Sequence, residues 1–83
     1  MELIARTTKQ LGNAIRRARK QRRLTQGQLG AHMGARQATV STLEKGEAAT
    51  QLRTLMDALA ALDLELVVRP RTTAKIQDLE DIF

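Results

Sequence analysis

The sequence contains no cysteine and a single histidine among its 83 residues. Without cysteine the chain can form neither disulfides nor thiolate metal sites, which fits a reducing compartment. His32 alone cannot assemble a zinc site, and no cluster of acidic residues falls on one helical face. We therefore expect no metal, no other cofactor and no enzymatic activity.

Long hydrophobic runs are missing as well. No apolar stretch approaches the roughly 20 residues that a membrane-spanning helix needs, and residues 1–6 are too short and too mixed in polarity for a signal peptide. We expect a soluble, cytoplasmic protein without a membrane partner. A chain of 83 residues forms one domain with a small core, so oligomerisation is its expected source of additional stability.

Positive charge is concentrated at the front of the chain. Residues 1–24 contain eight Lys or Arg against one Glu, residues 25–62 are balanced, and residues 63–83 contain three basic and five acidic residues. A basic region of this kind favours a polyanionic partner such as nucleic acid. A solvated helix face would give the same pattern, so the charge alone does not decide between the two interpretations.

Helical periodicity extends to about residue 62. Thr7 and Gln10 have the spacing of a capping box at the start of a first helix. The apolar face of this helix carries Leu11, Ala14, Ile15 and Ala18. Thr25 and Gln28 repeat the capping-box spacing for a second, short helix, which Gly34 is suited to end in a left-handed conformation.

Two further helices are predicted. The third begins near Arg36, turns Val40 and Leu43 inward, and stops at Gly46. Thr50 is the expected N-cap of the fourth. The expected core positions of the fourth helix are Leu52, Leu55, Met56, Leu59 and Leu62.

After residue 62 the periodicity changes. Residues 64–69 are rich in β-branched side chains and partly alternating, and Pro70 follows them, so they predict one short strand. A lone strand lacks a hydrogen-bonding partner, and in an otherwise helical chain that partner is the same strand of a second copy. The expected dimerisation residues are Leu64, Leu66, Val67 and Val68. The alternative is a monomer in which residues 64–69 lie extended against the fourth helix.

These patterns divide the chain into four parts. We expect an N-terminal extension (residues 1–6), a helical domain (residues 7–62), a dimerisation strand (residues 63–70) and a flexible C-terminal tail (residues 71–83). The tail is polar and acidic, with apolar residues at helical spacing, namely Ile76, Leu79, Ile82 and Phe83. So short a segment is marginal as an isolated helix, so we expect the tail either to be disordered or to fold against a partner.

Two short helices joined by a tight turn at Gly34 are the sequence form of a helix-turn-helix. In that motif the second helix lies in the major groove of DNA and the first crosses the backbone. Around the inward-facing Val40, the side chains are small or polar and include no Asp or Glu, namely Gln37, Ala38, Thr39, Ser41 and Thr42, which suits close approach to phosphates and base edges. Gln37 can bond bidentately to adenine. Gln26, at the start of the second helix, can hold a phosphate together with the helix N-terminal amides, or it can simply remain in solvent.

The wider motif runs Leu24-Thr25-Gln26-x-x-Leu29-Gly30, then Gly34, then Gln37-Ala38-Thr39-Val40-Ser41-x-Leu43-Glu44-Lys45-Gly46. With these spacings, residues 9–62 resemble the Xre/Cro-type family of phage and bacterial repressors. The resemblance implies an all-α, lambda-repressor-like helix-turn-helix bundle of four to five helices, to which one short C-terminal strand is added that pairs across a homodimer. Gly27 and Gly30 depart from the family pattern, which has helix formers there, and are expected to loosen the second helix without moving it.

The resemblance also implies roles for individual residues. The implied base contacts are Gln37, Ala38, Ser41 and Thr42. The residues expected at phosphates are Thr25, Gln26, Arg36, Thr39 and Lys45. Arg19 and Glu44 match a structural salt bridge that fastens the second helix of the motif to the first helix of the bundle.

Within that family, the strand after the fourth helix and the segments 37–41 and 62–66 are similar to those of HipB-type antitoxins. This similarity implies a homodimer that binds an inverted-repeat operator in double-stranded DNA, represses its own operon and binds a HipA-like kinase toxin. Three alternatives stay open. The protein is then a stand-alone Xre-family regulator, an antitoxin of another toxin class, or an interaction protein whose main task is inhibition of a toxin, with DNA binding secondary.

Overall fold

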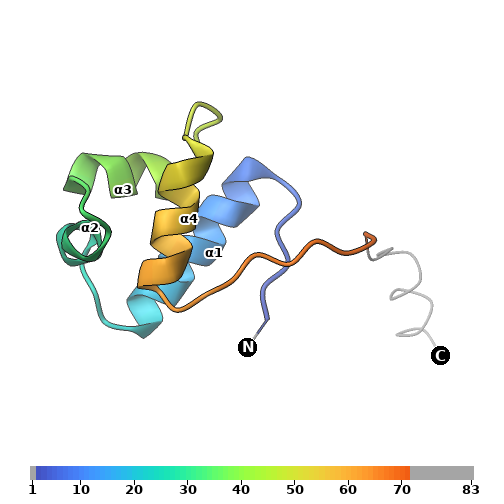
Figure 1. The fold of residues 1–83 in the computed structure, drawn as a ribbon, viewed down its shortest axis with the longest axis horizontal. Coiled ribbons are helices and arrows are strands. Elements are labelled where there is room, and N and C mark those ends of the chain that lie inside the picture. Colours follow the sequence, from blue (N-terminus) through green and yellow to red (C-terminus); the bar gives the residue numbers. More distant parts are fainter. Residues whose placement is uncertain (1, 72–83) are drawn as a thin grey trace.

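A computed structural model describes residues 2–71 of the chain. It contains four helices, α1 (Thr8–Gln21), α2 (Gln26–Met33), α3 (Gln37–Glu44) and α4 (Leu52–Ala61), arranged as a small bundle (Figure 1). The predicted order of four helices is confirmed, whereas a fifth helix in the tail would lie outside the described residues. None of the helices in residues 2–71 is long and apolar enough to cross a membrane.

The two predicted capping boxes differ in completeness. At α2 the box is complete, because the Thr25 hydroxyl accepts from the Gln28 N–H (3.0 Å) and the Gln28 side chain accepts from the Thr25 N–H (2.8 Å). At α1 the Thr7 hydroxyl accepts from the Gln10 N–H (3.0 Å), but the Gln10 side chain accepts from the Arg6 N–H (2.7 Å). The box predicted at α1 is therefore only half formed, and its second bond fixes the preceding residue instead.

All four helices are followed by a residue in the left-handed conformation, which is glycine in two cases and another residue in the other two. Gly34 (φ +70°) ends α2 and Gly46 (φ +72°) follows α3, as the sequence predicts. After α1 and α4 the left-handed position is held by Arg23 (φ 58°) and Asp63 (φ 57°). In both cases the next residue donates its N–H back to the last turn, which is the hydrogen-bond pattern of a Schellman motif.

The core is a single cluster to which all four helices contribute. It comprises Ile15, Leu29, Val40, Leu43, Ala58 and Leu62, all nearly or fully buried. Val40 and Leu43 thus anchor α3 as predicted. Packing α3 against α1 and α2 orients its opposite side outward, so the core determines which face of α3 is available to a partner.

The start of α4 differs from the sequence prediction. The N-cap is Gln51 rather than Thr50, and the Thr50 hydroxyl is buried without a hydrogen-bond partner among the described residues. Two of the predicted core residues are also wrong, because Leu52 is 69 % exposed and Met56 45 % exposed. The buried residues of α4 itself lie in its second half, so its first turn stands clear of the core and Met56 lies at the margin of the apolar face.

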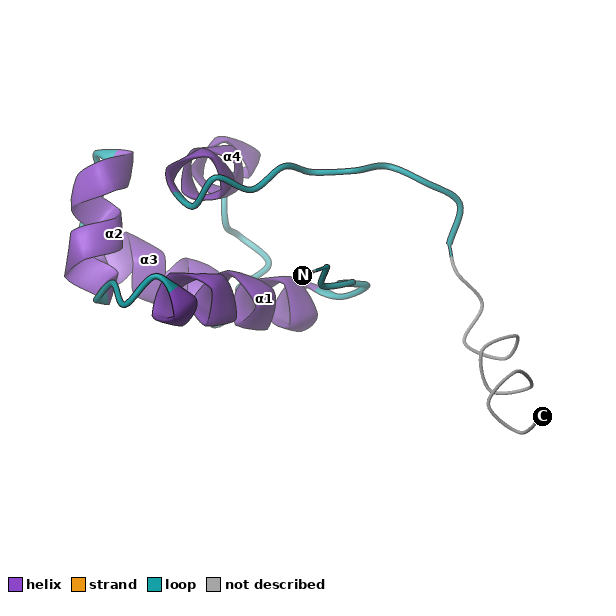
Figure 2. Ribbon diagram, turned by 90° about the horizontal axis from the view of Figure 1, so that it is seen from below, coloured by secondary structure: helices purple, strands orange, loops and turns teal. Residues whose placement is uncertain are grey.

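Residues 64–71 form an extended segment that is neither helix nor strand within the described part of the chain. It runs from the end of α4 away from the bundle (Figures 1 and 2). Within residues 2–71 its one backbone hydrogen bond joins the Leu64 N–H to the Leu59 carbonyl (2.8 Å). Leu66 and Val68 are exposed, so the segment does not lie along α4 as the monomeric alternative requires, and its backbone groups are available to a second strand.

Candidate nucleic-acid interface

The turn between α2 and α3 depends on a close approach of two backbone segments. The Ala35 N–H donates to the Gly30 carbonyl (2.8 Å). A Cβ atom on Gly30 would lie only 2.7 Å from the Ala35 carbonyl oxygen, whereas one on Gly27 would have a nearest neighbour 3.9 Å away. Gly30 therefore allows the tight helix-turn-helix geometry, while Gly27 has no packing reason to be glycine.

The predicted base-contact residues share the outer face of α3. Gln37, Ala38 and Thr42 are exposed and Ser41 is half-buried, while Val40 and Leu43 turn to the core. None of the outward residues carries negative charge. The arrangement presents an uncharged polar helix face, and the major groove of DNA is wide enough to admit an α-helix.

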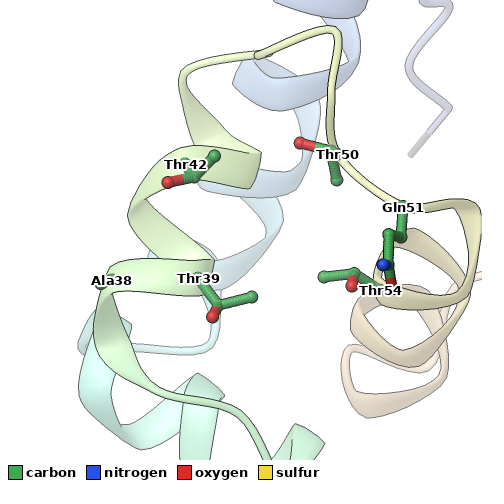
Figure 3. Close-up of a pocket in the computed structure, with 6 residues that line it drawn as sticks. All are labelled: Ala38, Thr39, Thr42, Thr50, Gln51 and Thr54. Carbon is green, nitrogen blue, oxygen red and sulfur yellow. The ribbon is translucent and has the colours of Figure 1, made fainter.

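Positive charge and hydroxyl groups flank this face. Arg36 and Lys45 are exposed at the two ends of α3. Beside α3 lies an open hollow in which Thr39 faces residues at the start of α4 (Figure 3). The hollow is lined by Ala38, Thr39, Thr42, Thr50, Gln51 and Thr54. Thr25 is exposed and Gln26 half-buried at the N-terminus of α2. The predicted phosphate contacts thus lie on α2 and on or beside α3, at the edges of the predicted base-contact surface.

A buried ion pair joins α3 to α1. The Arg19 Nε donates to Glu44 Oε2 (2.6 Å) and its Nη2 donates to Glu44 Oε1 (3.0 Å). The Arg19 Nη1 donates to the Leu24 carbonyl (2.7 Å). The hydrogen bond to Glu44 raises the pKa of Arg19, and burial opposes it. The pair inferred from the resemblance therefore lies at the place expected for it, with both side chains almost fully buried.

Sequence reasoning missed the residue that lets the two helices approach so closely. A Cβ atom on Gly12, within α1, would lie 2.5 Å from the Glu44 carbonyl oxygen. A glycine inside an amphipathic helix is a signal of close backbone contact, and it was available in the sequence. Because Gly12 has no side chain, the end of α3 can pack directly against the backbone of α1 at this position.

Two glutamines extend the ion pair to the outer face of α3. The Gln26 Nε2 donates to Glu44 Oε1 (3.2 Å), and the Gln37 Nε2 donates to the Gln26 Oε1 (3.3 Å). A continuous chain of hydrogen bonds therefore runs from Arg19 through Glu44 and Gln26 to Gln37. Sequence analysis placed Gln26 at a phosphate and Gln37 at a base, but did not predict that the two side chains bond to each other.

Comparison with known proteins gives a consistent result. A sequence model described as a helix-turn-helix domain matches residues 2–70. A curated relative, the uncharacterized HTH-type transcriptional regulator y4dL of Sinorhizobium fredii (strain NBRC 101917 / NGR234), is 34 % identical over 64 residues, which cover 77 % of this chain. The chain spans about a third (33 %) of the length of that relative.

Solved structures extend the comparison to three dimensions. A complex of a HipB variant with the O2 20mer has a TM-score of 0.80 and 29 % sequence identity, covering 87 % of this chain and 100 % of that one. HipB in a HipA-HipB-O2-O3 complex and HipB in a complex with the O4 20mer each have a TM-score of 0.77 and 30 % identity, covering 83 % of this chain and 97 % of theirs. The bundle described above is thus the fold of HipB.

Proposed function

Because the chain belongs to the helix-turn-helix domain family, we propose that it is a sequence-specific DNA-binding repressor that also acts as the antitoxin of a HipA-like kinase toxin. The observation that carries DNA binding is the outer face of α3. Gln37, Ala38 and Thr42 are exposed on this face. On the opposite face of the helix, Val40 and Leu43 are buried and hold α3 against the core. In this proposal the protein represses its own operon.

The proposed binding mode follows from the placement of α2 and α3. α3 enters the major groove with Gln37, Ala38, Ser41 and Thr42 at base edges. Gln26 uses one of its two amide N–H groups for Glu44, so the second is available to a phosphate oxygen at the N-terminus of α2. The other proposed phosphate contacts are Thr25, Arg36, Thr39 and Lys45.

We propose further that the protein binds DNA as a homodimer. The support is a set of exposed large apolar side chains among the described residues, namely Ile4, Leu52, Met56, Leu64, Leu66, Val67 and Val68. Pairing residues 64–69 with the same segment of a second copy would satisfy their backbone groups and cover part of this surface. A two-fold dimer binds an inverted repeat, with half-sites about one helical turn apart or a multiple of it.

The antitoxin role rests on the likeness to HipB, one of whose structures also contains HipA. Two alternatives are a stand-alone Xre-family regulator and an antitoxin of another toxin class. Residues 2–71 hold no group of three or more potential metal ligands, and the proposed function requires no metal or other cofactor.

Two measurements test the proposal. Gel-shift titration with the DNA upstream of the protein's own gene should show a sequence-specific complex, and a scrambled duplex of the same composition is the control. Co-expression with a kinase-like product of the neighbouring gene should give a stable complex. Specific DNA binding without any complex with a neighbouring product would favour the stand-alone regulator, and absence of specific DNA binding would contradict the repressor.

A further inference from the structure

We propose that Glu44 determines which base this protein prefers opposite Gln37, because it fixes the orientation of the Gln26 side-chain amide. The inference rests on the proposed DNA-binding function and deepens it. Glu44 is then a positioning residue, since it is buried and acts on DNA only through Gln26 and Gln37.

The first step is the chemistry of the Glu44 carboxylate. Its Oε2 accepts from the Arg19 Nε and its Oε1 accepts from the Arg19 Nη2. An ionised carboxylate can only accept hydrogen bonds. Any side chain that contacts Glu44 Oε1 must therefore present a donor, and the only part of Gln26 that can do so is its NH₂ group.

The second step transmits this constraint to Gln26. Its Nε2 faces Glu44 Oε1 at 3.2 Å, so its Oε1 is left to face Gln37 and accepts from the Gln37 Nε2 at 3.3 Å. Turning the Gln26 amide over would place its oxygen against the Glu44 carboxylate and remove a hydrogen bond from a charged group. The carboxylate thus selects one of the two amide orientations.

The third step concerns what Gln37 has left for DNA. One of its two amide N–H groups is used by Gln26, so one N–H donor and the Oε1 acceptor remain. Adenine offers an acceptor and a donor in the major groove, N7 and the N6 amino group, whereas guanine offers two acceptors, N7 and O6. The remaining groups of Gln37 match adenine and cannot satisfy guanine.

Neutralising the ion pair should therefore relax this preference. In the double variant Arg19→Met/Glu44→Gln both charges leave together, so no unpaired charge remains buried. The new amide at position 44 can offer either its oxygen or its nitrogen. Gln26 can then turn over and donate to the Gln37 Oε1, which frees both Gln37 N–H groups to donate to guanine.

The test begins with selection of binding sites by the full chain from a random duplex library. Affinities are then measured by fluorescence anisotropy for all single-base variants of the selected site. The base pair faced by Gln37 is identified as the one whose preference disappears in Gln37→Ala. We expect the native chain to prefer adenine there, and the double variant to lose roughly tenfold of its adenine-over-guanine ratio.

A rescue variant separates positioning from general stabilisation. Adding Gln26→Glu to the double variant places an acceptor-only carboxylate beside Gln37, so the adenine preference should return. Overall affinity should fall at the same time for every sequence, because the new charge repels phosphate. A purely structural role of Glu44 would weaken all positions of the site alike and would not respond to this rescue.

Several outcomes would overturn the inference. These are a preference of the native chain for guanine opposite Gln37, or an unchanged adenine-over-guanine ratio in a double variant whose circular dichroism shows a folded helical protein. If the double variant does not fold, Gln26→Leu cuts the same chain of hydrogen bonds and leaves the ion pair intact, and an unchanged ratio there overturns it equally. Failure of the native chain to select any sequence would instead contradict the proposed function itself.

Discussion

The Gly30 carbonyl accepts a hydrogen bond from the Ala35 N–H at 2.8 Å, and the Ala35 carbonyl oxygen would lie 2.7 Å from any Cβ atom at position 30. This contact sets the turn between the two helices of the motif. The second unusual glycine of α2, Gly27, lies one turn earlier and meets nothing closer than 3.9 Å. The two positions therefore form a matched pair for mutation.

Gly27→Ala should stabilise the fold by about 0.5–1 kcal/mol, because alanine favours the helix and fits the open space. Gly30→Ala should destabilise it by about 1–2 kcal/mol, because the added methyl group would force the backbone apart. Urea unfolding at one fixed protein concentration measures both changes. Equal stabilisation by the two substitutions would contradict a close contact at position 30.

The buried ion pair should behave as a unit. Arg19→Met alone leaves the Glu44 carboxylate buried without its cation and should cost about 3–5 kcal/mol of unfolding free energy. Arg19→Met combined with Glu44→Leu should cost much less, because no charge remains in the core. A double-mutant cycle by chemical denaturation measures the coupling. Simple additivity of the two single changes would show that the pair contributes nothing as a pair.

The sign of the stability change in Thr50→Val shows whether Thr50 is the N-cap of α4. If it were the N-cap of α4, Thr50→Val would cost about 1 kcal/mol. Its hydroxyl is instead buried without a partner among the described residues, so the isosteric change should leave stability unchanged or raise it by up to about 1 kcal/mol. Thermal unfolding followed by circular dichroism distinguishes these two stability changes. Thr54→Val, in the same hollow, is the control.

DNA binding should weaken steeply with salt. A dimer that neutralises roughly 6–10 phosphates should lose roughly 10³–10⁵ in affinity between about 50 and 200 mM salt. Anisotropy titrations at several salt concentrations give the slope. Lys45→Gln should reduce the slope by about one for each half-site, since it removes one proposed phosphate contact. A nearly flat salt dependence would speak against docking of this face on the phosphate backbone.

Residues 64–69 should pair across a dimer. Val67→Pro removes a backbone donor from the middle of the segment and leaves α3 untouched. This variant should be largely monomeric by light scattering and should lose cooperative binding to the full operator, while weak binding to a half-site survives. Val67→Thr, which keeps the donor and the β-branched shape, is the control. Dimerisation and operator binding that survive the proline would exclude strand pairing.

Local sequence signals determined much of the bundle. The capping box of Thr25 with Gln28 and the left-handed stop at Gly34 were predictable, because the groups involved lie within a few residues of one another. The inward positions Val40 and Leu43 followed from helical spacing, and they in turn indicated that Gln37, Ala38 and Thr42 face outward. The order of four helices and the candidate interface on the third therefore follow from the sequence.

Family resemblance supplied one long-range contact, the pairing of Arg19 with Glu44, which are 25 positions apart. The other long-range features required the tertiary structure. The start of α4 after Gln51 and the exposure of Leu52 depend on where the core ends, which periodicity along one helix cannot reveal. A strand at 64–69 needs hydrogen bonds from a second segment, and that partner is not contained in residues 2–71.

The close approach at Gly30 and the hydrogen bonds from Glu44 through Gln26 to Gln37 also required the tertiary structure. Their residue types were visible in the sequence, but their meaning depends on distances between atoms of different helices. Those distances are fixed only when Ile15, Leu29 and Val40 pack together and set the separation and rotation of α1, α2 and α3. In α3 the sequence alone indicated which side chains face outward, whereas tertiary packing determined which of them bond to residues of other helices.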